Sequence, residues 1–201
     1  MGTGRPVGAA RRLAGFAGAL AAVAALTLNA GKACADEVTP GGRLEVAFSP
    51  DGGAETLVLR VIDSAQTSVR ILAYTFTSRP VVRALIAARQ RGVAVALVAD
   101  AKSNLQEDRS GRAREALAEL ARAGCDVRVI DAFALSHDKV VVVDERTTEL
   151  GSYNFTSAAN RLNSETMLVV WQNPDLARQT LRHFARNYSL SIPFGASTRA
   201  Q

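Results

Sequence analysis

Short apolar runs alternate with amphipathic helical patterns through most of this chain, and that alternation limits its fold more than any other feature. The runs with the length and character of buried strands are residues 44–48, 68–76, 93–98, 127–130, 139–143 and 164–171. The segments with helical periodicity are residues 54–65, 78–92, 111–122 and 174–188. Repeated strand–helix units predict an α/β fold in which helices flank a mixed, largely parallel sheet.

Local signals agree with this pattern. Ser78 can cap the second helix, with Pro80 in its first turn, and a short helix is expected after the turn at Gly151. About 166 residues follow position 35, which suits one domain with one core. We expect a flexible lead-in at residues 36–43, the domain at residues 44–190 and a tail at residues 191–201.

The first 35 residues have the pattern of a secretory signal peptide. Three arginines precede an apolar run at residues 13–28, and small residues at positions 33 and 35 fit cleavage before Asp36. The run is shorter than the roughly 20 residues that a membrane-spanning helix needs. We therefore expect cleavage after Ala35 and an exported protein, either periplasmic or secreted.

Two other interpretations of the leader stay open. One is an uncleaved membrane anchor, and the other is a lipoprotein acylated at Cys34, against which the lack of an upstream Leu in Gly31-Lys32-Ala33 argues. The adjacent Arg11 and Arg12 indicate twin-arginine export only weakly, because the usual flanking residues are missing.

The charge and cysteine content narrow the class of protein. The formal net charge is +5, but the leader holds four basic residues and no acid, which leaves +1 for residues 36–201. Any affinity for a polyanion must therefore come from a local patch rather than from the overall field. Cys125 is the one cysteine beyond the leader, and we expect a small core residue rather than a reactive thiol.

A compact set of polar residues lies between positions 137 and 154, with the spacing H-x-K-x4-D-x6-G-S-x-N. Its members are His137, Lys139, Asp144, Gly151, Ser152 and Asn154. In an extended strand, His137 and Lys139 point to one side and Asp138 to the other. An imidazole, an ammonium, a hydroxyl and an amide can then surround one negatively charged phosphoryl group.

The chemistry requires a partner for the imidazole. His137 can attack phosphorus only through an unprotonated nitrogen, so another group must hold the proton on the second nitrogen. Glu165 is our candidate, although an ordinary surface glutamate is an equal alternative by sequence alone. Asp144 lies five residues past Lys139 on the opposite strand face, which favours a hydrogen-bonding role in the turn over direct proton transfer.

These residues resemble the HKD signature of the phospholipase D superfamily, and the chain is similar to the short, Nuc-type bacterial endonucleases within it. The further stretches that carry the resemblance are Phe48-Ser49-Pro50, Ile62-Asp63-Ser64-Ala65, Ala73-Tyr74-Thr75-Phe76-Thr77 and Asn163-Ser164-Glu165. The resemblance covers nearly all of residues 36–201 and is weakest at residues 102–114.

The resemblance implies a phospholipase D-like fold and a phosphohistidine intermediate on His137. It implies phosphate contacts from Lys139, Ser152 and Asn154, with Glu165 as the partner of His137 and with Gly151 and Asp144 in supporting roles. It also implies hydrolysis without a metal ion or other cofactor, in agreement with a sequence that holds two histidines and no evident ligand cluster.

The chain holds one copy of the motif and so supplies one imidazole, whereas the reaction needs two. In-line displacement puts the attacking and departing atoms on opposite sides of phosphorus, and the departing oxygen needs a proton. The other histidine, His183, has no lysine two residues on, and we expect it to be a surface or packing residue. We therefore expect a homodimer in which His137 of each subunit reaches one shared site, as nucleophile and as general acid.

Three functions fit these features. The favoured one is a phosphodiesterase that acts as a metal-independent endonuclease on DNA or RNA, with little sequence preference because no base-reading element is evident. The alternative is a phospholipase D acting on phosphatidylcholine-type lipids, although neither an apolar exposed loop nor a basic amphipathic anchor is evident. The third is a non-catalytic phosphate-binding or nucleic-acid-binding module. The basic residues of segment 102–114 are either solvated or form a rim that tracks phosphates.

Overall fold

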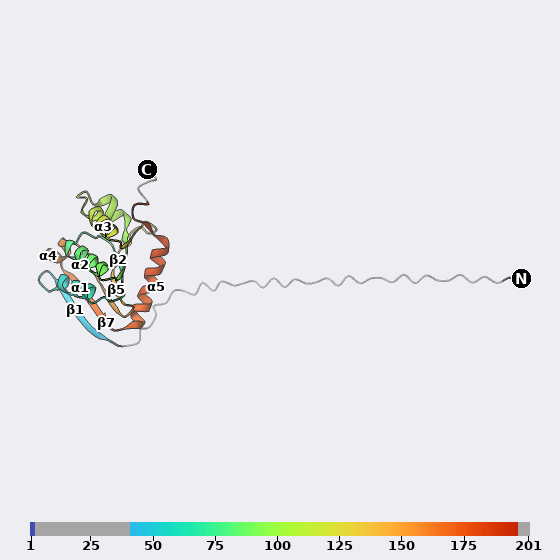
Figure 1. Ribbon diagram of the computed structural model, residues 1–201, viewed down its shortest axis with the longest axis horizontal. Coiled ribbons are helices and arrows are strands. Elements are labelled where there is room, and N and C mark those ends of the chain that lie inside the picture. Colours follow the sequence, from blue (N-terminus) through green and yellow to red (C-terminus); the bar gives the residue numbers. More distant parts are fainter. Residues whose placement is uncertain (3–40, 197–201) are drawn as a thin grey trace. The chain divides into compact units, whose positions relative to one another are not determined.

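The structure, a computed structural model, describes residues 1–2 and 41–196. Apart from its first two residues, the expected leader lies outside the described residues, and so does its cleavage site. From residue 43 onward, strands alternate with helices and form one mixed, eight-stranded sheet (Figure 1). The predicted α/β architecture with flanking helices is therefore confirmed.

The strands lie close to their predicted positions, with two additions after residue 144. They are β1 (Arg43–Ser49), β2 (Ser68–Ala73), β3 (Ala94–Asp100), β4 (Asp126–Ile130), β5 (Lys139–Val143), β6 (Thr147–Gly151), β7 (Glu165–Trp171) and β8 (Ile192–Pro193). Neither β6 nor β8 was predicted.

The helices also follow the sequence pattern. They are α1 (Ala54–Asp63), α2 (Arg79–Gln90), α3 (Arg112–Arg122), α4 (Ser157–Arg161) and α5 (Pro174–Leu190), with a π-helical turn η1 (Lys102–Glu107) between β3 and α3. Ser78 caps α2 as expected, because its side chain accepts the backbone N–H of Val81. Asn173 caps α5 in the same way through the N–H of Leu176.

The sheet is mixed, but the expectation of a largely parallel sheet is wrong. The strand order is β1-β7-β6-β5-β2-β3-β4-β8, and the parallel pairs are β2 with β3 and β3 with β4, which α2 and α3 connect. The other neighbours pair antiparallel. One reason is that residues 144–146, which join β5 to β6, are too few for a parallel crossover; the longer β6–β7 connection, which contains α4, also returns antiparallel.

Two layers of helix cover the sheet. In Figure 1, α1, α2 and α3 lie on one side of it and α5 lies on the other. The larger core cluster joins α1–α3 to the sheet through fully buried residues such as Val58, Leu85 and Leu117. The smaller cluster packs Phe184 of α5 against Leu72 and Ile130. Strand residues therefore alternate between a face toward α1–α3 and a face toward α5.

Features at the margins of the domain refine the sequence predictions. Residues 192–193, expected in the tail, pair with β4 as the short strand β8. Cys125 is a buried core residue, as expected, and burial raises the pKa of its thiol to about 11 despite the nearby Arg89. Among the described residues, none of the helices combines the length and the apolar character needed to span a membrane.

Candidate active site

Six of the residues singled out by sequence line one small cavity of about 440 Å³. They are His137, Lys139, Gly151, Ser152, Asn154 and Glu165. The cavity lies where β5 begins, β6 ends and β7 begins. Because these strands are antiparallel neighbours, those three ends meet at one edge of the sheet. The structure therefore brings these six residues together at one cavity.

Gly151 sets the shape of the turn that enters the cavity. It pairs with Met167 on β7, and the backbone N–H of the next residue, Ser152, donates to the carbonyl of Thr166 at 2.9 Å. A Cβ atom on residue 151 would lie 2.2 Å from that same carbonyl oxygen. Only glycine fits here, so the supporting role of Gly151 is to let β6 and β7 approach closely enough to place Ser152 beside Glu165.

Lys139 places a buried ammonium in the cavity. The residue is 5% exposed, its Nζ donates to the carbonyl of His137 at 2.7 Å, and the same atom lies 5.1 Å from the centre of the Tyr74 ring. Burial lowers the pKa of Lys139, and the negative charges of Asp138 and Glu165 offset part of that effect. Among the described residues, the ammonium hydrogen-bonds one oxygen, the His137 carbonyl, which leaves donors for an incoming anion.

Glu165 lies in the cavity but does not hydrogen-bond His137 in this structure. Its carboxylate accepts the hydroxyl of Ser152 at 2.5 Å and the amide of Asn163 at 3.0 Å. The expected Glu165–His137 bond is absent from the described residues, so the structure shows Glu165 orienting Ser152 instead. The hydroxyl of Ser152 in turn accepts the backbone N–H of Thr166 at 3.0 Å.

Asn154 presents a buried, unused oxygen. Its Oδ1 atom is inaccessible and has no hydrogen-bond partner within residues 41–196. Such an orphaned acceptor is costly in a folded protein, and a functional role is one of its recognised explanations. The turn after Gly151 brings the Asn154 amide to the cavity. The following residue, Phe155, is held in place because the backbone N–H groups of Thr77 and Ser78 donate to its carbonyl.

Sequence reasoning missed the aromatic ring that supports His137. The ring of Tyr74, at the end of β2, lies 4.6 Å from the His137 ring, centroid to centroid. Asn104 of η1 fixes this segment, since its amide donates to the Tyr74 carbonyl and accepts the N–H of Phe76. The only signal in the sequence was that Tyr74 lies in one of the stretches that carry the family resemblance.

A second support also escaped the sequence analysis. Asp100, 2% exposed at the end of β3, accepts the N–H of Ser103 at 2.7 Å and the N–H of Ser136 at 2.8 Å. The second bond fixes the residue just before His137. A buried carboxylate at a strand end is typical of this kind of loop clamp, but its partner lies 36 residues away in the chain.

Asp144 lies away from the cavity, in the turn between β5 and β6. It and Glu145 both have positive φ, and the carboxylate accepts the backbone N–H groups of Gln66, Thr67 and Ser68 and the hydroxyl of Thr67. Partial burial opposes ionisation, but these bonds outweigh it and lower the pKa of Asp144. Its observed bonds are those of a residue that fixes the turn.

The segment at residues 102–114 is more ordered than its polar sequence suggests. Ser103 and Asn104 are buried because their side chains bond Thr75 and the Tyr74 segment. Lys102 pairs with Glu107 at 3.5 Å, and Arg114 donates to the carbonyl of Leu105. The side chains of Arg109 and Arg112 are exposed, so the segment contributes both a buried support and two solvated cations.

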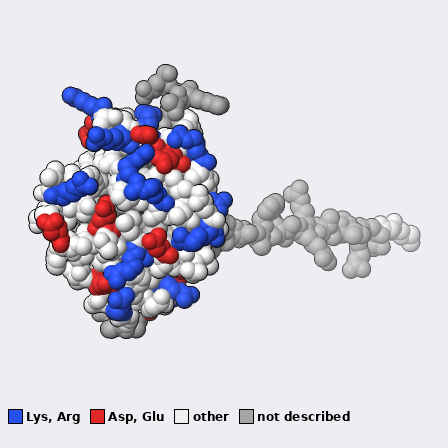
Figure 2. Space-filling view, turned by 60° about the vertical axis from the view of Figure 1, so that its left-hand side comes forward, with Lys and Arg blue, Asp and Glu red and all other residues white. Residues whose placement is uncertain are grey.

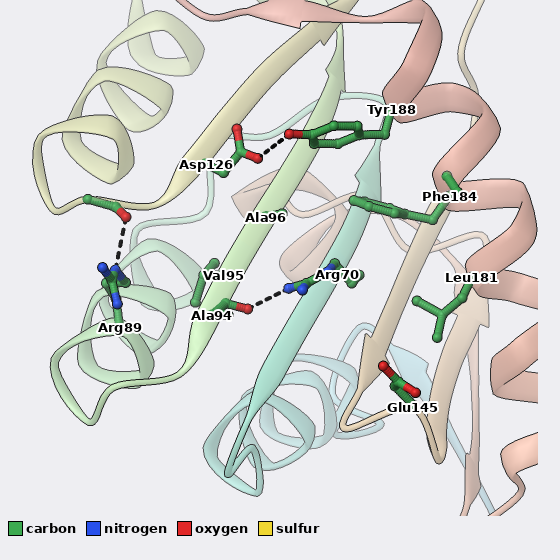
Figure 3. A pocket seen from close by; sticks show the side chains of 12 residues that line it. Arg70, Arg89, Ala94, Val95, Ala96, Asp126, Glu145, Leu181, Phe184 and Tyr188 are labelled. Atoms are coloured by element: carbon green, nitrogen blue, oxygen red, sulfur yellow. Dashed lines mark hydrogen bonds between the residues drawn. The ribbon is translucent and has the colours of Figure 1, made fainter.

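A larger cavity, of about 640 Å³, lies between the sheet and α5 (Figure 3). Alanines 94 and 96 of β3 form part of its lining, and Phe184 and Tyr188 project into it from α5. Arg70 donates to the carbonyl of Ala94 at 2.6 Å, and Tyr188 donates to Asp126 at 2.6 Å. Neither His137 nor Lys139 lines this cavity, so the candidate catalytic groups belong to the smaller one.

Metal binding has no obvious place in the described part of the chain. Within residues 41–196, no group of three or more His, Cys, Asp or Glu side chains is arranged to hold a metal ion. The cavity instead combines an imidazole, a buried ammonium, an amide and a hydroxyl. This set can attack a phosphorus atom and bind the oxygens around it.

Comparison with known proteins agrees with this site. Residues 58–188 match the family described as "Cardiolipin synthase, PLD-like domain". A phospholipase D of Rickettsia conorii is 32% identical over 142 residues, which cover 71% of this chain and 68% of that protein. A mitochondrial cardiolipin hydrolase of Danio rerio is 28% identical over 145 residues, covering 70% and 61%.

Solved structures give the same result. The phospholipase D family member Nuc from Salmonella typhimurium aligns with a TM-score of 0.73 and 39% identity, covering 77% of this chain and 99% of that one. NucT from Helicobacter pylori aligns with a TM-score of 0.65 at 20% identity, which supports the fold alone. The fold and the site together define a phosphodiester hydrolase. The chain belongs to the phospholipase D superfamily, as its motif predicted.

Proposed function

We propose that this protein is a metal-independent endonuclease that cleaves DNA or RNA phosphodiesters with little sequence preference. The observation that carries the proposal is the single cavity shared by His137, Lys139, Ser152, Asn154 and Glu165 in a chain that aligns with 99% of Nuc. Figure 2 shows basic and acidic side chains intermingled over the face in view, which favours local phosphate contacts over a broad basic surface.

The reaction would proceed in two displacements. A ring nitrogen of His137 attacks phosphorus, and the bond from phosphorus to the departing oxygen breaks as the nitrogen–phosphorus bond forms. Lys139 and the Asn154 amide would bind the phosphoryl oxygens. Water then attacks the phosphohistidine, which releases His137 and leaves a phosphomonoester.

A homodimer would supply the second imidazole. His137 of a second subunit would protonate the departing oxygen in the first step and accept the proton of water in the second. An exposed apolar row on β1, formed by Leu44, Val46 and Phe48, supports this part of the proposal. Phe48 pairs in register with Thr166, the neighbour of Glu165, so the row begins beside the strand that carries the site.

Glu165 would serve the reaction after a change of partner. In the described state it accepts the Ser152 hydroxyl, and a substrate phosphate that took over Ser152 would free one carboxylate oxygen for a proton of an imidazole. We also propose, from the leader alone, that the protein is exported and is periplasmic or secreted.

The test is incubation of plasmid DNA and of RNA with the purified protein in excess EDTA. We expect cutting by the native protein and a loss of at least about a thousandfold in His137→Ala, because the nucleophile is removed. Ser189→Ala, which removes a hydroxyl that donates to the carbonyl of Arg186 in the same helix, is the matched control and should cut normally. Intact nucleic acid with the native protein, or equal cutting by His137→Ala, would contradict the proposal.

A phospholipase D activity is the second candidate. Two observations favour it: the names of the sequence relatives, and the exposed side chains of Leu135 and Leu162, which lie two and three residues from His137 and Glu165. Release of choline from phosphatidylcholine vesicles, without cutting of DNA or RNA, would select this function and reject the endonuclease.

A further inference from the structure

The residue between His137 and Lys139 makes the contact that carries this inference. The Asp138 side chain leaves the cavity and meets α5, where both carboxylate oxygens lie 3.2 Å from Nε2 of His183. Asn187 adds a bond of 3.2 Å from its amide to Oδ2 of Asp138. His183 and Asn187 are four residues apart and therefore lie on one face of the helix. His183, expected to be a surface or packing residue, is partly exposed but has a specific partner.

Contacts other than those to α5 also hold the backbone at this point, among them the bond from the N–H of Ser136 to Asp100. Tyr74 donates its N–H to the carbonyl of Asp138 at 2.9 Å, and Ala73 pairs with Lys139 across the two strands. These bonds fix the distance between β2 and the start of β5. Because this ladder begins at Lys139, it restrains the preceding residues His137 and Asp138 less against rotation about the chain axis.

The bonds to α5 act against that rotation. Asp138 projects from the opposite side of the chain to His137 and Lys139, so a carboxylate held by two donors works as a lever on both catalytic side chains. Small displacements matter here, since a shift of about 1 Å in a reacting group can reduce the rate on the order of a hundredfold.

We propose that His183 and Asn187 are positioning residues that act through Asp138 to set the orientation of His137 and Lys139 in the cavity. The inference rests on the proposed function for its kinetic test but not for its structural one. His183 takes no part in the proton transfers; its contribution is the N–H bond to Asp138.

The kinetic test compares His183→Ala, Asn187→Ala and His183→Gln on plasmid DNA. We expect the two alanine variants to lower kcat about tenfold or more with KM changed less than about threefold, because the oriented state of the cavity becomes less populated. His183→Gln keeps an N–H donor and should recover most of the activity. Ser189→Ala on the same helix is the control and should match the native protein.

The structural test uses the low histidine content of the chain. With two histidines in the sequence, a variant at position 183 leaves His137 as the one remaining imidazole in the ¹⁵N NMR spectrum. We expect the His137 signals to be the same in His183→Gln as in the native protein and to shift or broaden in His183→Ala. Thermal unfolding identifies any variant that fails to fold. In that case the same NMR comparison is made with Asp138→Asn, which removes the charge of the side chain and keeps its shape.

The outcomes separate the two proposals. Unchanged His137 signals and a native kcat in a folded His183→Ala/Asn187→Ala variant would overturn the positioning role while leaving the endonuclease intact. Shifted His137 signals in a protein that cuts neither DNA nor RNA would overturn the endonuclease and leave the positioning role intact.

Discussion

Asp144 shows how one side chain in the signature can support the site without entering it. Its carboxylate accepts four bonds from residues 66–68, which tie the turn after β5 to the start of β2. We expect Asp144→Ala to lower the free energy of unfolding by about 2 kcal/mol near neutral pH, because a charged acceptor of several backbone N–H groups is lost. Urea unfolding measures the change.

The pH dependence of that loss has a definite sign. Because the pKa of Asp144 is lowered in the folded state, its contribution is present above the unfolded pKa of about 3.9 and is lost as the pH falls through the folded pKa. The difference between the native protein and Asp144→Ala should therefore shrink toward acidic pH. A folded variant that keeps its stability but loses about a thousandfold in kcat would instead assign Asp144 to the chemistry.

Residues within the motif were predictable, and their distant partners were not. The spacing of the motif was enough to group His137, Lys139 and Asn154 in one pocket, although the antiparallel pairing that brings them together was not predicted. By contrast, Tyr74 and His183 reach the site from β2 and α5, and no local pattern states which strand or helix will face the motif. The Glu165–His137 bond stays a prediction, and the sequence did not indicate that Glu165 accepts the Ser152 hydroxyl in this structure.

Strand β6 carries the least expected side chain of the core. Glu149 is fully buried between Val141 and Val169 in register, and neither carboxylate oxygen has a partner among the described residues. Burial raises the pKa of Glu149 well above its usual range, so the folded protein holds this group in its neutral form.

This burial predicts a stability that falls as the pH rises. Above the unfolded pKa of about 4.3 the unfolded chain ionises Glu149 while the folded chain keeps the proton, which costs up to about 1.4 kcal/mol per pH unit until the folded pKa is reached. Glu149→Gln removes the titration, so its stability relative to the native protein should rise as the pH increases from about 4.3 toward the raised folded pKa. Parallel stability curves for the two proteins across that range would contradict the prediction.

The same residue explains why β6 was not predicted. Its sequence, Thr147-Thr148-Glu149-Leu150-Gly151, has one apolar side chain, so it lacks the alternation that marks a half-buried strand. Backbone hydrogen bonds to a strand on each side, β5 and β7, stabilise β6 in spite of its polar composition. The π-helical turn η1 was not predicted for a similar reason. Its buried polar side chains, which bond nearby backbone, are of the same residue types as those of a solvated loop.

At the scale of the whole molecule, the apolar row on β1 leads to a prediction about assembly. Leu44 and Val46 are 65% and 52% exposed, so replacing both with Glu should cost the isolated subunit little stability. In the proposed homodimer, the same change would bury two charges per subunit and should abolish association and most of the activity. Sedimentation measures the mass, and Leu190→Glu, at an exposed leucine of α5, is the control.

The homodimer would be contradicted by a native protein that sediments as a monomer and whose cutting rate per molecule of protein does not change with protein concentration. The sequence could suggest the dimer from stereochemistry, but it could not identify the row, since Leu44 and Val46 have the same apolar character as the buried strands. The sheet topology was mispredicted for a comparable reason: strand–helix alternation in the first half of the chain does not extend to the hairpins of the second.

The six residues that line the cavity all fall between positions 137 and 165, on or just beyond the ends of three strands that follow one another in the chain. A tandem gene duplication would therefore copy the complete lining in one event. A fused two-copy chain could then diverge, with one half keeping its nucleophile and the other adapting to a new leaving group, an option closed to the proposed homodimer, whose identical subunits would have to serve both ends of the reaction.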